Sequence, residues 1–200
     1  KPDLGIQKVA ERGISGRGLL IDIDLYRKSI GKPIDQSSNE QISVADIDGA
    51  LALQGSEIQP GDILLFRTGW LAAVRSGEAK ISSPVVSPGL AQSESIAEWL
   101  WNNQVALAAA DNVALEAWPA NRENIRTAAE EKGSLERSNH TGMLHRVLIP
   151  LLGLTIGELW DLDELADACQ ARGSHTFLLT AEPINMPGGV GSPANALAII

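Results

Sequence analysis

Three short, nearly continuous apolar runs constrain the fold of this chain most strongly. They extend from Gly18 to Ile23 (GLLIDI), from Asp62 to Arg67 (DILLFR) and from Val105 to Ala110 (VALAAA). Short apolar runs bounded by glycine, proline or polar turn residues are typical of buried strands. The fold class therefore depends on what separates these strands along the chain.

Helix signals lie between the strands. Ser43 and Asp46 form a capping pair for a helix from Val44 to Gln54, which stops at a glycine. Ser95 and Glu98 form a second capping box, ahead of a helix with an apolar stripe. Strands and helices that alternate in this way indicate an α/β domain built in layers.

The second half of the chain continues the pattern. We expect a helix from Thr141 to Leu152, a strand from Thr155 to Trp160 and a helix from Asp161 to Arg172. Two consecutive strands follow, from His175 to Ala181 and from Asn195 to Ile200, so part of the sheet must pair in an antiparallel or mixed way. The prediction is a single α/β domain across the whole chain, with a mixed sheet.

The charge of the chain excludes several classes of partner. It has 200 residues and a formal net charge of −9, so nucleic acids and anionic membranes, which are polyanions, would repel it. A small molecule or another protein chain is the expected partner. No apolar run approaches the roughly 20 residues that span a bilayer, and nothing at the start resembles a signal peptide. We therefore expect a cytoplasmic location.

Residue order and number exclude other common sites. Cys169 is the only cysteine, which rules out an intrachain disulfide and a thiolate metal cluster, and its place on an apolar helix face predicts a buried thiol. The glycines from Gly13 to Gly18 precede a strand, whereas a dinucleotide-binding loop follows one and opens a helix. The cluster from Gly188 to Ser192 is followed by neither the lysine nor the helix of a P-loop. No G-x-S-x-G elbow of a serine hydrolase occurs.

His145 and Glu158 are the pair that most strongly suggests chemistry. They are thirteen positions apart, with the histidine in an apolar, helix-like stretch and the glutamate in a strand-like one. Packing these elements side by side would bring an imidazole and a carboxylate to one point, and such donors suit zinc or manganese. Two ligands do not complete a metal site, and a histidine on an apolar face also fits an ordinary core residue. His140, in a polar loop, and His175, at a strand start, fit structural roles.

Other charged residues lie where strands end. Asp111 follows a strand and Glu116 comes five residues later, and ligands of open α/β sheets bind at the carboxyl ends of strands. The alternative for Asp111 is a loop aspartate that caps backbone N–H groups. Arg67 ends another strand, and its guanidinium could bind a substrate carboxylate or form a structural ion pair with Asp111 or Glu116.

Five motifs follow one another along nearly the whole chain. They are GRGLLIDI (16–23), GDILLFRTGW (61–70), AADNVALEAWP (109–119), HRVLIPLLGLTIGELWDLDELA (145–166) and PGGVGSPAN (187–195). In this order they resemble the metal-dependent cyclase family, which includes bacterial kynurenine formamidase and isatin hydrolase. The resemblance implies a swivelling β/β/α fold and a homodimer or homotetramer. It also implies arylformamidase-like hydrolysis of a C–N bond in an amide, formamide or lactam, by water activated on a divalent metal, Zn or Mn.

The resemblance also assigns metal ligands. In this family an H-x-G-T-H-x-D-x-P-x-H motif supplies ligands and a general acid/base histidine, and a later histidine and a Glu or Gln complete the site. His145 and Glu158 match the later pair. The motif does not occur in these 200 residues, and because the chain begins at Lys1 without a methionine, we expect the motif in a preceding segment.

A pocket for an aromatic amide is expected beside this metal. Trp70 and Trp118 are the candidates for its apolar wall, Arg67 is a candidate substrate contact, and Asp111 and Glu116 are candidates to support the metal ligands from behind. The alternative function, from a different class, is a non-catalytic module of the same fold that binds a small molecule or forms oligomers.

Overall fold

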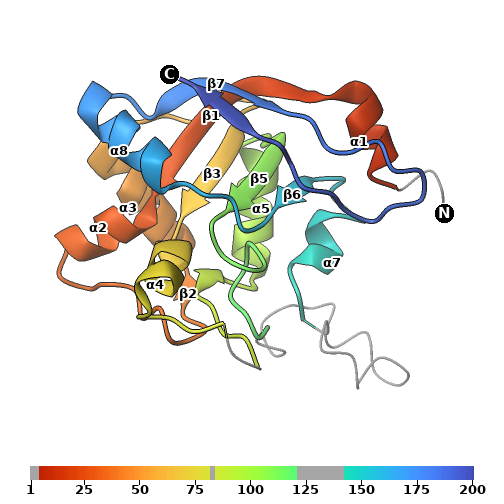
Figure 1. Cartoon of the computed structure of the whole chain (residues 1–200). Coiled ribbons are helices and arrows are strands. Elements are labelled where there is room, and N and C mark those ends of the chain that lie inside the picture. Colours follow the sequence, from red (N-terminus) through yellow and green to blue (C-terminus); the bar gives the residue numbers. More distant parts are fainter. Residues whose placement is uncertain (1–4, 82–83, 121–141) are drawn as a thin grey trace.

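The central sheet is built on the predicted apolar strands. The computed structural model describes residues 5–81, 84–120 and 142–200. Within them, strands hydrogen-bond in the order β6-β5-β3-β1-β7-β8 (Figure 1). Their bounds are Ile14–Asp22 (β1), Ile63–Arg67 (β3), Leu107–Ala110 (β5), Thr155–Gly157 (β6), Thr176–Ala181 (β7) and Leu197–Ile199 (β8).

Both pairing directions occur in this sheet. β1, β3, β5 and β6 are parallel to one another, whereas β7 runs antiparallel to both β1 and β8. The prediction of an α/β fold with a mixed sheet is confirmed. β1 begins at Ile14, before the predicted start at Gly18. Its first residues, Ile14 to Arg17, pair with β7 alone, whereas those from Gly18 onward also pair with β3.

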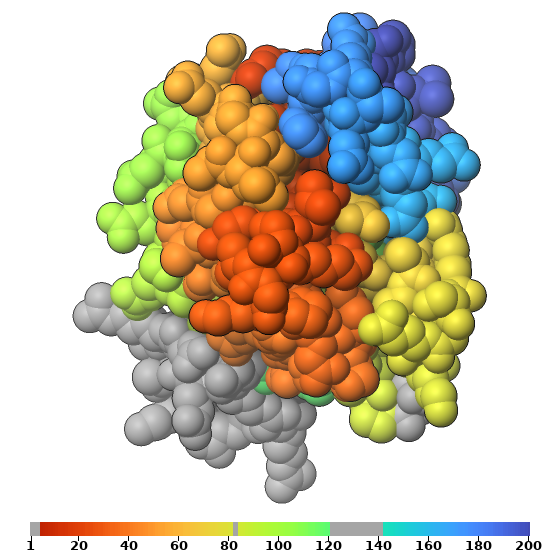
Figure 2. Space-filling model, turned by 90° about the vertical axis from the view of Figure 1, so that its left-hand side faces the viewer, coloured from red at the N-terminus to blue at the C-terminus, as the bar shows by residue number. Residues whose placement is uncertain are grey.

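Helices cover both faces of the sheet. Leu19 and Ile21 of β1 pack in a core with Ile47 of α3, and Leu20 points the other way, into a core with Cys169 of α8. Figure 2 shows the side of the molecule where α2, α3, α4 and α8 form the surface. The helix bounds are Gln7–Arg12 (α1), Ile23–Ser29 (α2), Val44–Gln54 (α3), Trp70–Ser76 (α4), Glu94–Asn102 (α5), His145–Leu148 (α7) and Asp163–Arg172 (α8).

The capping signals were correct for two helices. In α3, Ser43 Oγ accepts from Asp46 N at 3.2 Å, and Asp46 Oδ2 accepts from Ser43 N at 2.9 Å, which is the predicted capping box. α8 ends at Gly173, whose φ of 68° is left-handed and favours glycine. These two helices lie on opposite faces of the sheet. On each face, therefore, one helix has an end that the sequence predicts correctly.

Two other predicted helices differ from the structure. The box of Ser95 and Glu98 is wrong: Ser93 caps α5 instead, with its hydroxyl accepting from Ile96 N at 3.2 Å, and Ser95 Oγ bonds to Ser93 Oγ at 2.9 Å. α7 contains 4 residues, fewer than expected, and it ends at Leu148 ahead of Pro150, which has no N–H with which to continue the helix. The expected start of that helix at 141, and the charged stretch 121–139, lie outside the described residues.

A small second sheet supports the loop that follows β5. It pairs β2 (Gln41–Ile42) with β4 (Gly89–Leu90) in parallel. Leu90 of β4 also bridges to Glu116, which ties that loop to the body of the protein. No helix in the described part of the chain is long and apolar enough to cross a membrane.

Candidate metal and substrate site

The carboxyl ends of β5 and β6 define the candidate site. The two strands are parallel and pair through Ala109 and Gly157, so the residues that follow them emerge at the same edge of the sheet. Glu158 comes directly after β6. The short helix α7 lies beside this edge (Figure 1). Open α/β sheets bind ligands at this position.

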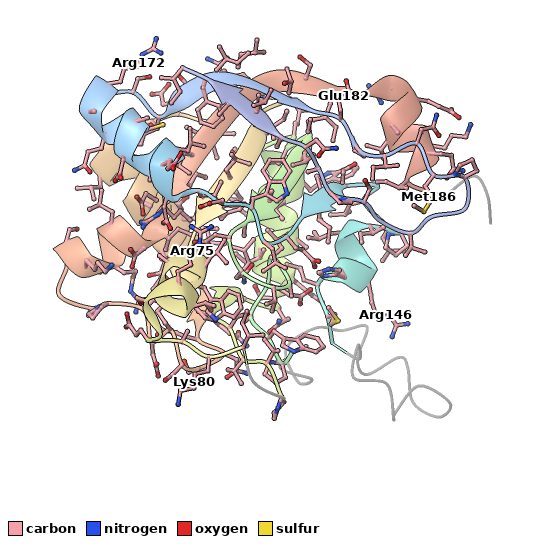
Figure 3. All side chains as sticks on the ribbon, in the orientation of Figure 1. Arg75, Lys80, Arg146, Arg172, Glu182 and Met186 are labelled. Atoms are coloured by element: carbon pink, nitrogen blue, oxygen red, sulfur yellow. The ribbon has the colours of Figure 1, made fainter. Side chains whose placement is uncertain are left out.

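The imidazole of His145 lies between two glutamates. Its Nε2 is 2.9 Å from Glu158 Oε1, and its Nδ1 is 2.5 Å from Glu116 Oε1. Glu116 is fully buried, whereas Glu158 is 39% exposed at its side chain. The neighbouring Arg146 points the other way, away from the sheet (Figure 3). The predicted meeting of His145 and Glu158 is therefore present in the structure.

Electrostatics favour a positive charge at this imidazole. Burial alone lowers the pKa of His145, but the hydrogen bonds to Glu116 and Glu158 outweigh it and raise the pKa to about 9. The ring is thus protonated at neutral pH and is held by a carboxylate on each side. The two carboxylates thus stabilise one positive charge here, and a metal ion at Nε2 would take the place of the proton on that nitrogen.

Irregular backbone brings the two glutamates to the histidine. Leu115, directly before Glu116, has a φ of 60°, and Leu159, directly after Glu158, has a φ of 57°. Left-handed conformations are costly for such residues and persist where surrounding contacts determine them. Here Leu159 N donates to Asn112 O at 2.9 Å, so the backbone after β6 is bonded to the backbone after β5.

A cavity of about 370 Å³ opens beside His145 and Glu158. Apart from these two residues its walls are apolar or aromatic: Val85, Val113, Ala114, Trp118 and Met143. An apolar cleft with few convergent polar groups is the usual form of a small-molecule site. Polar chemistry is thus concentrated at one point of an otherwise apolar cavity.

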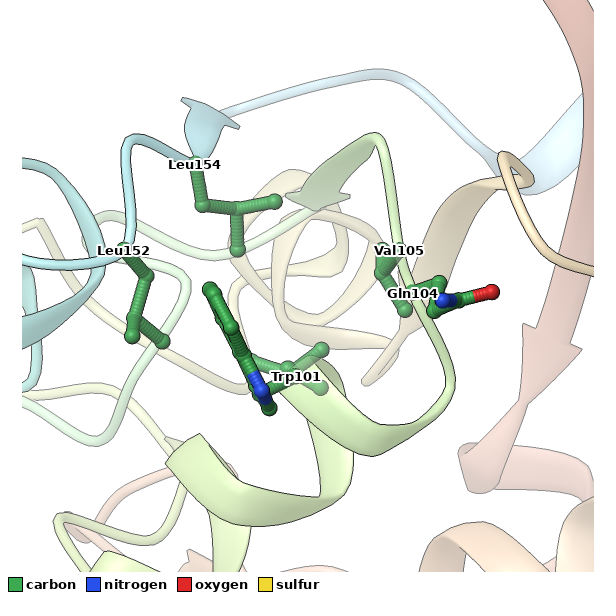
Figure 4. Close-up of a pocket in the computed structure, with 6 residues that line it drawn as sticks. Trp101, Gln104, Val105, Leu152 and Leu154 are labelled. Atoms are coloured by element: carbon green, nitrogen blue, oxygen red, sulfur yellow. The ribbon is translucent and has the colours of Figure 1, made fainter.

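Another cavity, of about 310 Å³, lies at the end of α5, away from this chemistry (Figure 4). It is lined by Leu100, Trp101, Gln104, Val105, Leu152 and Leu154. None of these side chains titrates, and Gln104 is the one polar member. Because no acid, base or metal donor lines it, the cavity at His145 is the candidate for catalysis.

The donor pair fits a divalent metal. Metal bonds of about 2.1 Å place two adjacent ligand atoms about 3.0 to 3.4 Å apart, for octahedral to tetrahedral angles. The observed separation of His145 Nε2 and Glu158 Oε1 is 2.9 Å. Within the described residues, no set of three or more His, Cys, Asp or Glu side chains is arranged to hold a metal. His145 and Glu158 therefore form a two-donor set.

Comparison with known proteins identifies the family. Residues 3–117, more than half of the chain, match the model of the Cyclase family ("Putative cyclase"). The chain belongs to this family. The resemblance inferred from the five sequence motifs is confirmed. No curated protein matches this cyclase-family chain.

Solved structures agree with the assignment. A crystal structure of a novel cyclase is 33% identical, with a TM-score of 0.73 over 98% of this chain and 57% of its own. Isatin hydrolase A from Labrenzia aggregata, bound to benzyl benzoate, is 18% identical, with a TM-score of 0.63 over 97% of this chain and 64% of its own. A potential metal-dependent hydrolase with cyclase activity is 19% identical, with a TM-score of 0.54 over 92% and 64%. The chain spans less than two thirds of the length of each.

Arg67 forms ion pairs inside this cyclase-family chain. Its guanidinium is bonded to Asp22 at 3.0 Å, Asp24 at 3.1 Å and Asp163 at 3.0 Å. Burial opposes its charge, but Asp22 and Asp24 raise its pKa above the ordinary value. The expected partners Asp111 and Glu116 were wrong, and the three carboxylates already engage Nε and both Nη atoms of the guanidinium. The structural alternative is the one observed.

The two tryptophans have different positions. Trp118 lines the cavity beside His145, as expected. Trp70 is fully buried and packs against Val85 and Val113, two residues of the cavity wall. Its indole Nε1 donates to Val86 O at 3.1 Å. The prediction that Trp70 lines the pocket is therefore wrong, because it lies one layer behind the wall.

Asp111 and Glu116 differ in the groups that they contact. Asp111 accepts from Thr68 N, Thr68 Oγ1 and Gly69 N at 2.7 to 2.8 Å, so it caps backbone N–H groups, the structural alternative weighed for it. Burial raises its pKa to about 6, against these hydrogen bonds. Of the two candidates to support the metal ligands, only Glu116 contacts His145.

The remaining candidates lie elsewhere. Cys169 is fully buried, as predicted, and burial raises the pKa of its thiol. His175 precedes β7, and burial lowers its pKa. His140 lies outside the described residues. Sequence reasoning missed Met143 and Val113 of the cavity wall. Their proximity in sequence to His145 and Asp111 was the available signal.

Proposed function

We propose that this cyclase-family protein hydrolyses the C–N bond of an amide, formamide or lactam at a divalent metal, with His145 and Glu158 as two of the ligands. The observation that carries the proposal is the 2.9 Å pair of Nε2 and Oε1 in the wall of an apolar cavity. Family membership agrees with it, and one structural neighbour is named as a potential metal-dependent hydrolase.

The donor atoms limit which metals the site would bind. One imidazole nitrogen and one carboxylate oxygen suit zinc and manganese, whereas a soft metal would require thiolates. When bound, such an ion lowers the pKa of a water molecule and polarises a carbonyl oxygen. The remaining ligands would come from an H-x-G-T-H-x-D motif of the kind that the family resemblance implies.

The cavity wall supports an aromatic substrate. Trp118, Met143 and the two valines of the wall would bury an aromatic ring, with His145 and Glu158 at the bond to be cleaved. The isatin hydrolase structures share the fold, so an aromatic lactam is a suitable first probe.

The test uses the full-length gene product. Metal content is measured by mass spectrometry, and hydrolysis is assayed with isatin and with N-formylkynurenine. His145→Ala is expected to lower metal content and to reduce kcat/KM at least about tenfold, because a ligand is removed. His175→Ala, at the start of β7, is the matched control and should retain both.

Two results would contradict the proposal. One is a His145→Ala protein with the metal content and rate of the wild type. The other is a wild-type protein that binds no divalent metal and cleaves neither compound, which would favour the non-catalytic binding module.

A further inference from the structure

The carboxylate of Glu116 is an acceptor on every side that the structure describes. Oε2 accepts from Leu144 N at 2.6 Å, and Oε1 accepts from His145 N at 3.0 Å. The third contact is His145 Nδ1, at 2.5 Å from Oε1. Glu116 is 0% exposed, so water does not compete for these positions.

Because the Glu116 carboxylate acts as an acceptor, it determines which nitrogen of the His145 ring carries a hydrogen toward it. Backbone N–H groups can only donate, so the two bonds from Leu144 and His145 hold Glu116 as a carboxylate acceptor. An acceptor at 2.5 Å from Nδ1 requires a hydrogen on Nδ1. Nε2 is then the nitrogen that faces Glu158 and the cavity, and a metal would displace the hydrogen that Nε2 shares with Glu158 Oε1.

We infer that Glu116 is a positioning residue, which holds a hydrogen on Nδ1 of His145 and so presents Nε2 as the metal-binding atom. Its effect on a metal rests on the proposed function, whereas the hydrogen on Nδ1 is a property of the chain itself. A ring flip would exchange the two nitrogens, and the bond to a buried carboxylate opposes it. The same carboxylate increases the electron density at Nε2 and thus its strength as a ligand.

The backbone around Glu116 is built to hold it. Its own N–H donates to Ala114 O at 2.5 Å, and Asn112 Nδ2 donates to its carbonyl at 3.1 Å. Leu90 N donates to Leu115 O at 3.1 Å and so pins the preceding residue to β4. A group held this firmly positions its partner with little loss of entropy on ligand binding.

Asp111 provides a matched control from the same loop. It is also a buried carboxylate that accepts three hydrogen bonds, but its partners are Thr68 and Gly69. Asp111→Asn therefore removes the same charge from the same loop without touching His145. Glu116→Gln and Asp111→Asn should both lower the stability of the fold, because each replaces a buried carboxylate by an amide. Only Glu116→Gln should change the hydrogen bond at Nδ1 of His145.

The test combines two readouts on the full-length protein. In the metal-free wild type, 1H–15N NMR with 15N-labelled histidine should show a downfield, exchange-protected Nδ1–H resonance of His145. This resonance should shift upfield or lose its protection in Glu116→Gln and remain in Asp111→Asn. Calorimetric titration with Zn²⁺ alone should give a Kd weakened about 10- to 100-fold in Glu116→Gln and little changed in Asp111→Asn.

The outcomes separate this inference from the proposed function. Equal weakening of Zn²⁺ binding in both variants, with the Nδ1–H resonance intact in both, would show that Glu116 only stabilises the fold. An unprotonated Nδ1 in the wild type would overturn the inference directly, even if Glu116→Gln did not fold. A wild type that binds no Zn²⁺ would refute the proposed function, and the Nδ1–H resonance alone would then decide the inference.

Discussion

Replacement of Arg67 by methionine tests a buried charge cluster of the fold. The Arg67 side chain is only 16% exposed and joins β3 to two helices, because Asp22 caps α2, Asp24 belongs to α2 and Asp163 begins α8. The side chains of Asp22 and Asp24 are 8% and 5% exposed. Methionine replaces the alkyl stem of Arg67 and carries no charge, so the substitution removes the guanidinium and keeps the packing of the stem.

The expected loss follows from the burial of the carboxylates. Removing one partner of a buried ion pair costs about 3 to 5 kcal/mol, because the other charge stays buried without compensation. Lys28 also pairs with Asp24, at 2.7 Å, from an exposed position, and offsets a small part of that loss. We expect the free energy of unfolding to fall by about 3 to 5 kcal/mol, a large share of the roughly 5 to 15 kcal/mol typical of a domain.

Urea unfolding followed by circular dichroism measures the effect. Arg75→Met is the matched control, since Arg75 also pairs with aspartates but is half exposed on α4 (Figure 3); its loss should be much smaller. Adding Asp24→Asn to Arg67→Met should recover part of the stability, because one uncompensated charge is removed. Equal losses at Arg67 and Arg75 would refute the reasoning. A raised KM for substrate with unchanged stability would restore Arg67 as a substrate contact.

Three further predictions concern single positions and are measured by urea unfolding. Ser43→Ala should lower the stability by about 1 kcal/mol through loss of the α3 cap, and an unchanged midpoint would contradict the role of the capping box. Because burial raises the pKa of Asp111 to about 6, its stabilising effect is greatest below about pH 4 and is lost as the pH rises through 6. From pH 7 to 5 the wild type should gain about 1 kcal/mol relative to Asp111→Asn, and a relative loss would show the opposite shift. Leu159→Gly should keep or raise the stability by up to about 1 kcal/mol, because it relieves a left-handed φ, and a clear loss would refute that strain.

The sequence predicted the parts of the fold that depend on local signals. The apolar runs became β1, β3 and β5, and the cap at Ser43 and the stop at Gly173 lie where expected. α2 was missed because it follows β1 without a loop, with Asp22 as the cap, so its first residue was counted in the apolar strand. α4 was missed because it begins after Gly69 without a side-chain cap, and the capping rules therefore had no signal.

The site was predictable only in part. His145 and Glu158 are close in sequence and lie on successive elements, so their meeting followed from packing those elements together. The partners of Arg67 could not be predicted, because Asp163 is 96 residues away and reaches it through α8 on the sheet face. Trp70 and Trp118 have similar apolar surroundings in sequence, and only the tertiary structure separates the cavity wall from the layer behind it.

The geometry at His145 depends on tertiary contacts because α7 is too short to be stable alone. A helix of 4 residues does not recover its nucleation cost, and its N-cap, Leu144, has no side-chain oxygen to satisfy the first N–H groups. Two tertiary contacts stabilise α7 in place of helix length and a side-chain cap. Leu144 and Leu148 are buried in the core, and Glu116 accepts from the N–H groups of Leu144 and His145. The carboxylate that orients the imidazole therefore also holds the helix that carries it, so the position of α7 and the orientation of the ring are determined together.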